Sequence, residues 1–178
     1  FMIYADHAAT TKISETAKLA MLSAMEKDWY NPSSLYTPGQ QASGTLMDAR
    51  VRIAHCLGCL PKEIYFPSGG SEADNQAILS AAAIGKRQGK MHIISTAFEH
   101  HAVLHTLKKL EKEGFEITLL DVGEKGIVSP VQVEKAIRPD TILVTVMYAN
   151  NEIGTIQPIR EIGAICRKNG VLFHTDAV

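Results

Sequence analysis

The sequence predicts an α/β protein with a mostly parallel sheet and helices on both faces. From residue 64 onward, short apolar runs alternate with longer helical segments, an order that is typical of doubly wound parallel sheets. Two of the runs, 142–146 and 171–173, are apolar at nearly every position. Strands that are covered by helices on both sides have this composition.

Composition narrows the class of protein. The chain has 178 residues, 46% of them hydrophobic, and a formal net charge of −1, which fits about one globular domain. No apolar run approaches the roughly 18 residues that a membrane span needs, and the charge balance favours neither nucleic acid nor an anionic membrane as a partner. The N-terminus does not resemble a secretion signal, and three cysteines fit a reducing compartment. We therefore expect a cytoplasmic protein.

The first part of the chain is predicted to be mainly helical. Leu19, Leu22 and Met25 recur at helical spacing with polar residues between them, which indicates an amphipathic helix. Gly58 follows a second helical segment and suits its C-terminal end. The predicted elements are a strand at 3–6, a helix at 13–27, a turn at 31–34 and a helix at 38–57.

The remaining chain predicts alternating strands and helices. Gly114 and Gly170 stand where two of the helices should end. The predicted strands span 64–66, 91–95, 116–120, 141–147 and 171–174. The predicted helices span 72–88, 101–113, 130–137 and 159–168.

The segment Ser68-Gly69-Gly70-Ser71 stands between a predicted strand and a predicted helix. The free backbone N–H groups at a helix start, together with the helix dipole, favour an anion there. Gly70 lacks a Cβ and allows close approach, and Ser71 adds a hydroxyl donor. Neither the nucleoside-triphosphate loop nor the dinucleotide fingerprint is present. The segment fits a phosphate site, and it equally fits an ordinary capped helix.

Polar side chains follow three further predicted strands. His100 comes after 91–95, Asn151 after 141–147 and Asp176 after 171–174, and ligands of open α/β sheets bind beyond these carboxyl ends. An anion site, an imidazole, an amide and a carboxylate together suit pyridoxal 5'-phosphate. This cofactor needs a phosphate anchor, a flat group over its ring, a donor to its 3′ oxygen and a carboxylate at its pyridine nitrogen.

The chain resembles the N-terminal part of cysteine desulfurases of the NifS/IscS type, which are class V, fold-type I pyridoxal-phosphate enzymes. The resemblance rests on stretches that occur in family order along the whole chain. They are Tyr4–Thr11, Asn31–Ser34, Ser68–Asn75, Glu99–Leu104, Asn150–Gly154 and His174–Val178.

The resemblance implies a role for each matching residue. Gly70 and Ser71 would hold the phosphate, and His100, the candidate catalytic residue, would stack on the cofactor ring. Asn151 would hydrogen-bond the 3′ oxygen and Asp176 would pair with the pyridine nitrogen. The implied activity moves sulfur from L-cysteine to an enzyme thiol and releases L-alanine. The resulting persulfide would serve iron–sulfur cluster assembly or other sulfur delivery. The implied partners are a second copy in a homodimer and a sulfur acceptor or scaffold protein.

The resemblance also implies a domain organisation. Residues 1–12 would belong to the small domain of the full fold, and 13–178 to the N-terminal portion of the large cofactor-binding domain, whose seven-stranded-type sheet would be truncated here. The cofactor-binding lysine and the sulfur-accepting cysteine of the family lie beyond this stretch. We therefore expect these 178 residues to be inactive by themselves.

Two other functions stay open. Another class V enzyme, such as a selenocysteine lyase or a small aminotransferase, would share the same cofactor residues. Alternatively, the chain as it stands is a non-catalytic piece that only binds the phosphate or a partner chain.

No metal site is predicted. His101 and His105 have a spacing that can hold zinc, but Ala102 stands where the zinc-protease motif has its glutamate. Cys56 and Cys59 form a single C-x-x-C pair without a second one, which favours two ordinary residues at a helix end.

Overall fold

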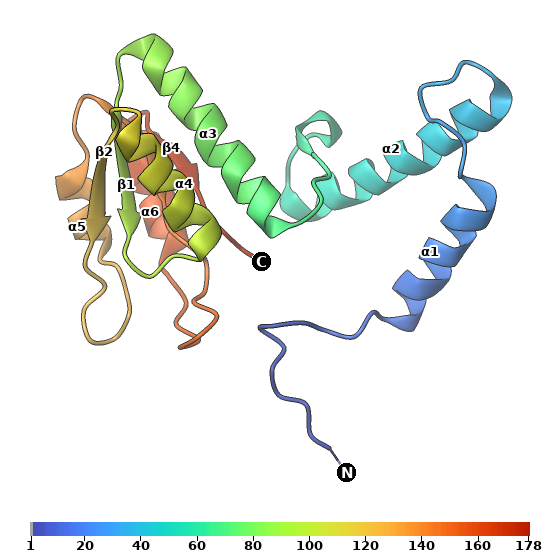
Figure 1. Cartoon of the computed structure of the whole chain (residues 1–178), viewed down its shortest axis with the longest axis horizontal. Coiled ribbons are helices and arrows are strands. Elements are labelled where there is room, and N and C mark those ends of the chain that lie inside the picture. Colours follow the sequence, from blue (N-terminus) through green and yellow to red (C-terminus); the bar gives the residue numbers. More distant parts are fainter. Residues whose placement is uncertain (1) are drawn as a thin grey trace. The chain divides into compact units, whose positions relative to one another are not determined.

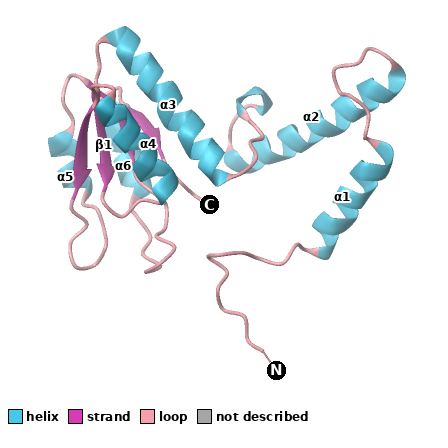
Figure 2. Cartoon of the chain, viewed as in Figure 1, coloured by secondary structure: helices cyan, strands magenta, loops and turns pink. Residues whose placement is uncertain are grey.

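The computed structural model describes residues 2–178 and divides the chain into two compact units, Phe1–Phe66 and Pro67–Val178. Length alone predicted about one domain. All strands among the described residues lie in the second unit (Figure 2). None of the described helices combines the length and the apolar character needed to cross a membrane.

The first unit is helical, as expected for most of its length. Ser14 caps the first helix, where its Oγ accepts a hydrogen bond from the Ala17 N–H at 3.2 Å. Gly58 ends the second helix with a φ of 68°, in the left-handed region that favours glycine. The elements are α1 (Glu15–Lys27), α2 (Thr37–Leu57) and the short 3-10 helix η1 (Pro61–Glu63).

The strands predicted at 3–6 and 64–66 are wrong, because neither segment forms a strand in the structure. The Ile64 carbonyl accepts a hydrogen bond from the Arg50 guanidinium instead of from a neighbouring strand. Pro67, which follows, has no N–H to donate to a ladder. A short β-rich run needs another strand to pair with. The described residues of this unit contain no such strand, and local composition could not show this.

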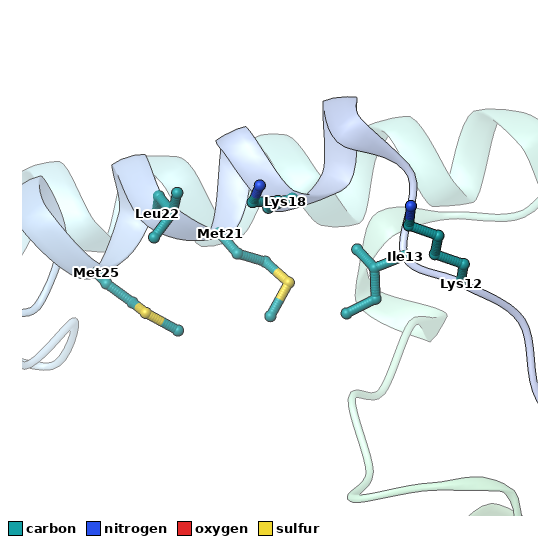
Figure 3. A pocket seen from close by; sticks show the side chains of 6 residues that line it. All are labelled: Lys12, Ile13, Lys18, Met21, Leu22 and Met25. Atoms are coloured by element: carbon teal, nitrogen blue, oxygen red, sulfur yellow. The ribbon is translucent and has the colours of Figure 1, made fainter.

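The predicted apolar stripe of α1 is present, but none of the residues of α1 is buried. Within the first unit the stripe borders an open hollow (Figure 3). The residues that line the hollow are Lys12, Ile13, Lys18, Met21, Leu22 and Met25.

The second unit holds a four-stranded parallel sheet in the order β2-β1-β3-β4. The predicted parallel α/β architecture is confirmed, with one strand fewer because 64–66 does not join. The strands are β1 (His92–Thr96), β2 (Glu116–Leu120), β3 (Thr141–Thr145) and β4 (Leu172–His174).

Helices cover both faces of this sheet, as predicted (Figure 1). Ile93 and Leu143 are buried in a core with the first two helices of the unit. Ile94 and Val144, their neighbours along the strands, are buried in a second core with the other two helices. Alternate strand residues point to opposite faces, so each core fills one side. The helices are α3 (Gly70–Gln88), α4 (His101–Lys112), α5 (Pro130–Ala136) and α6 (Ile159–Lys168).

The strand order places a reversal of the chain path between β1 and β3. From β1 the chain moves to β2 on one side, and it then returns to add β3 and β4 on the other side. In parallel sheets such a reversal opens a crevice beyond the carboxyl ends of the two central strands, where ligands bind. The loops that follow β1 and β3 both lead into this region.

Gly85 provides a test of how closely α3 packs on β3. A Cβ at this position would lie 2.5 Å from the Lys90 carbonyl oxygen and 3.1 Å from Ile142. The backbone oxygen cannot easily move aside, so we expect Gly85→Ala to lower the free energy of unfolding by about 1–3 kcal/mol. Urea denaturation of the full-length protein that carries this chain measures the change.

Gly44→Ala is the matched control, because Gly44 is a helical glycine of α2 with no atom within 4 Å of its added Cβ. Alanine there should be neutral or stabilising by up to about 1 kcal/mol. Equal destabilisation by both substitutions would contradict the close packing at Gly85.

Candidate functional site

The loop before α3 presents the start of that helix. Gly69 is extended, with φ 169° and ψ 179°, and the helix begins at Gly70. Ser68 donates both its N–H and its hydroxyl to the Glu72 carboxylate, each at 2.6 Å, and these bonds lower the pKa of Glu72. The N–H groups of the first helical turn have no partner within the helix. The structure therefore has a helix start after a loop at the predicted anion site, the strand expected before it is absent, and anion binding there stays a prediction.

Gly70 lies close to another segment. A Cβ at Gly70 would overlap the side chain of Val178. The Val178 N–H donates to the Asp176 carboxylate at 3.0 Å. The start of α3 and the segment after β4 therefore lie against each other, and Gly70 and Asp176 belong to one region.

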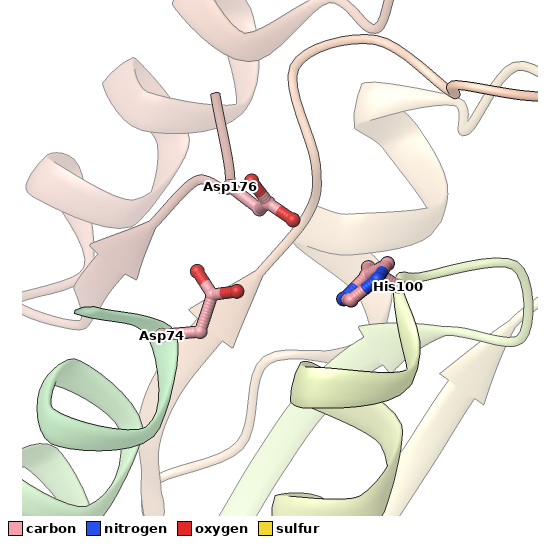
Figure 4. Close-up of side chains that lie close together, drawn as sticks. All are labelled: Asp74, His100 and Asp176. Atoms are coloured by element: carbon pink, nitrogen blue, oxygen red, sulfur yellow. The ribbon is translucent and has the colours of Figure 1, made fainter. Parts of the chain in front are cut away.

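Three side chains from separate segments converge in this region. Asp74 comes from the second turn of α3, His100 from the residue before α4 and Asp176 from the segment after β4 (Figure 4). One potential ligand atom of each lies within 4.8 Å of the others. Asp74 and Asp176 are buried, with exposed fractions of 3% and 9%, whereas His100 is exposed. Two buried carboxylates thus face an accessible imidazole.

The electrostatics of this cluster favour a cation. Burial and the charge of Asp176 raise the pKa of Asp74, His100 acts in the opposite direction, and the net result is a pKa of about 6. His174 Nε2 lies 3.4 Å from the Asp74 carboxylate, but burial lowers the pKa of His174, so this imidazole is mainly neutral at pH 7. The repulsion between the two carboxylates is relieved by a proton or by a positively charged ligand group.

His100 is held by the start of its own helix. Its Nδ1 accepts a hydrogen bond from the Ala102 N–H at 3.1 Å, as the capping residue of α4. In the neutral imidazole the proton then lies on Nε2. The ring therefore has a defined orientation and an accessible face.

Asn151 lies within a turn that Asn150 builds. The side-chain oxygen of Asn150 accepts from the N–H groups of Glu152 and Ile153 at 2.9 and 3.0 Å. Its amide donates to the Phe98 carbonyl at 3.1 Å. Asn151 itself is exposed and makes no side-chain hydrogen bond among residues 2–178. Asn150 thus shapes the turn, and the amide of Asn151 is available to a ligand.

Two buried acids near these residues were missed by the sequence analysis. Asp74 lies in the quoted stretch Ser68–Asn75, and Glu99 directly precedes His100, so both were named only as part of motifs. Glu99 is 4% exposed, and burial raises its pKa to about 7. The available signal was an acidic residue inside each motif, because a carboxylate is seldom buried without a specific partner.

The structure brings together three of the five predicted site residues. His100 and Asp176 share the cluster with Asp74, and Gly70 contacts the segment after β4. Ser71 and Asn151 are exposed and lie outside the measured cluster. The ligand roles of all five stay predictions, as does the expected lack of a metal.

The comparisons with known proteins agree with one another. The family model described as aminotransferase class-V matches residues 3–178. The cysteine desulfurase IscS of Methanosarcina thermophila is 50% identical over 99% of this chain and 43% of its own length. A solved NifS-like protein has a TM-score of 0.92 and 36% identity, covering 97% of this chain and 48% of its own. A structure described as SspA in complex with cysteine has a TM-score of 0.89 and 38% identity, over 97% and 49%.

These matches cover only part of each relative. The chain spans less than half the length of the curated cysteine desulfurases compared with it.

Asp74 should make the stability of the ligand-free protein depend on pH. Its pKa in the folded state is raised from 3.8 to about 6, so the folded state binds this proton more tightly than the unfolded state does. The contribution of this bound proton to the free energy of unfolding is fully present below about pH 4. It is lost as the pH rises through about 6. We expect Asp74→Asn to flatten the fall in the free energy of unfolding between pH 4 and 7, measured by urea denaturation of the full-length protein.

Asp48→Asn, at an exposed position of α2, controls for the change from carboxylate to amide. We expect it to leave the pH dependence unchanged. A wild-type profile that Asp74→Asn leaves unaltered would show that Asp74 does not titrate in this way.

Proposed function

Because the chain belongs to the class V aminotransferase family, we propose that the protein that carries it is a pyridoxal-phosphate-dependent cysteine desulfurase. It would take sulfur from L-cysteine onto a thiol of its own and release L-alanine. The observation that carries the proposal is the convergence of Asp74, His100 and Asp176 beyond the ends of parallel strands. The names of the relatives support the substrate, because one related structure is described as a complex with cysteine.

The residues of the cluster fit the nitrogen end of the cofactor. A buried pair of carboxylates is costly unless a positive group or a proton accompanies it, and a protonated pyridine nitrogen is such a group. When bound, pyridoxal phosphate supplies an electron sink for bonds at the substrate Cα. Asp176 would bind the ring nitrogen, and Asp74 would add to the negative potential that keeps the nitrogen protonated.

The residues at the start of α3 fit the phosphate end. The unpartnered N–H groups of the first turn and the positive end of the helix dipole attract an anion. Gly70 would contribute its backbone N–H, and the hydroxyl of Ser71 is exposed and able to donate. His100 would lie over the ring and Asn151 would donate its amide to the 3′ oxygen.

The sulfur-accepting thiol requires a different environment from that of Cys166. This residue is completely buried, and burial raises the pKa of its thiol to about 11. The thiolate is the reactive form, so Cys166 is unsuited to the task. The accepting cysteine and the lysine that binds the cofactor would come from other parts of the full-length protein.

We infer also a cytoplasmic homodimer that passes sulfur to a scaffold for iron–sulfur clusters or to another acceptor.

The test is made on the full-length protein that carries this chain. Incubation with pyridoxal phosphate should give an absorbance band at about 400–430 nm, which borohydride should bleach. In the presence of a reducing thiol, the loaded protein should release sulfide from L-cysteine much faster than free pyridoxal phosphate does. Cofactor binding without sulfide release, but with selenide release from selenocysteine or with amino-group transfer, would replace the proposal by another class V activity.

The substitution Asp176→Asn tests whether the charge of this carboxylate, and not only its hydrogen bonding to the cofactor, is needed for activity. The amide can still hydrogen-bond but cannot stabilise a protonated ring nitrogen, so we expect sulfide release per bound cofactor to fall by at least about tenfold. Asp121→Asn, an exposed residue after β2, is the control and should keep full activity. Unchanged turnover in Asp176→Asn would remove this residue from the cofactor site.

A further inference from the structure

The side chain of Glu99 joins the ends of the two central strands. Its Oε1 accepts from the Thr96 hydroxyl at 2.6 Å, at the last residue of β1. Both carboxylate oxygens accept from the Met147 N–H, at 3.1 and 3.0 Å, just after β3. Glu99 is 4% exposed. It therefore forms a buried bridge at the point where the chain path reverses between β1 and β3.

A second bridge joins the same two loops beside it. The Asn150 amide donates to the carbonyl of Phe98 at 3.1 Å, one residue before Glu99. The side-chain oxygen of Asn150 meanwhile holds the turn that contains Asn151. The loop after β1 and the loop after β3 are thus joined by hydrogen bonds from Glu99 and from Asn150.

Each of these two bridging residues is the immediate neighbour of a residue proposed to bind the cofactor. Glu99 precedes His100, and Asn150 precedes Asn151. A residue that is fixed by buried hydrogen bonds leaves its neighbour little freedom of backbone direction. The spacing between the imidazole of His100 and the amide of Asn151 therefore depends on these bridges.

Glu99 occupies a costly position for a carboxylate. Burial and the charges of Asp176 and Asp74 raise its pKa, the hydrogen bonds from Thr96 and Met147 lower it, and the net result is a pKa of about 7. A position that only filled space would be served by an apolar side chain. The chain instead keeps a side chain that can accept several hydrogen bonds at once.

We propose that Glu99 is a positioning residue that sets the geometry of His100 and Asn151 around the cofactor ring. It acts through these two residues and does not itself contact the cofactor. This inference rests on the proposed function, because it assumes that His100 and Asn151 border the ring. The structural part, the bridge between the strand ends, stands independently of the ligand.

The experiment compares Glu99→Ala with Glu99→Gln in the full-length protein. Alanine removes all the acceptors, whereas glutamine keeps an acceptor for the Met147 N–H and an amide that can pair with the Thr96 hydroxyl. We expect Glu99→Ala to weaken pyridoxal-phosphate binding by at least about tenfold and to change the visible circular dichroism of the bound cofactor. Glu99→Gln should restore most of the affinity and the dichroism.

His92→Ala is the control for a loss of stability alone. His92 is fully buried and bridges the same sheet away from the site. From the start of β1 it makes 2.8 Å contacts with Thr141 at the start of β3 and with Thr118 in the middle of β2. It should lower the melting temperature while leaving the cofactor dichroism of the folded protein unchanged. If His92→Ala and Glu99→Ala changed dichroism and affinity alike, the effect would be general destabilisation and the inference would be wrong.

The outcomes separate this inference from the proposed function. If the wild-type protein bound no pyridoxal phosphate, the proposed function itself would fail. If the wild type bound the cofactor and Glu99→Ala matched it in affinity and dichroism, only the positioning role would be overturned. A defect in Glu99→Ala that Glu99→Gln did not relieve would also overturn it, because the role requires hydrogen-bond acceptance at this position.

Discussion

The pairing of β1 with β3 at the centre of the sheet is the constraint on which the site depends. These strands are neighbours in space although β2 lies between them in sequence. Their carboxyl ends therefore meet where the chain path reverses, and the loops that follow them can be joined by Glu99 and Asn150. His100 and Asn151 owe their places to this pairing. Asp176 reaches the same region because β4 extends the sheet beside β3.

Charge burial links the fold to the proposed chemistry. Asp74, Glu99 and Asp176 are all at most 9% exposed, and the charge of Asp176 raises the pKa of each of the other two. Such an arrangement costs stability in the ligand-free protein, and a bound positive group would offset part of that cost. Functional sites often keep groups whose pKa values are shifted by burial and by like charges. The burial of these acids thus supports a ligand with a cationic centre beside Asp74 and Asp176.

The sequence predicted the second unit well because its signals are local. The strands and helices after residue 90 follow apolar runs and glycine ends, and 116–120 and 159–168 were predicted with their observed bounds. The strand at 64–66 failed because a strand depends on a partner, which no local pattern shows. Motif order was enough to single out His100 and Asp176, but Asp74 and Glu99 could be recognised only from contacts between distant segments. The positions of Ser71 and Asn151 relative to a ligand depend on groups outside the chain.

In the proposed holoenzyme, the buried carboxylates would hold a protonated pyridine nitrogen. Nitrogen magnetic resonance of the full-length protein, loaded with pyridoxal phosphate labelled at the ring nitrogen, reports that protonation directly. We expect a protonated nitrogen, coupled to its bound proton, in the wild type at neutral pH. In a variant without the Asp176 carboxylate we expect this proton to be lost. An unprotonated nitrogen in the wild type would contradict the assignment of Asp74 and Asp176 to this end of the cofactor.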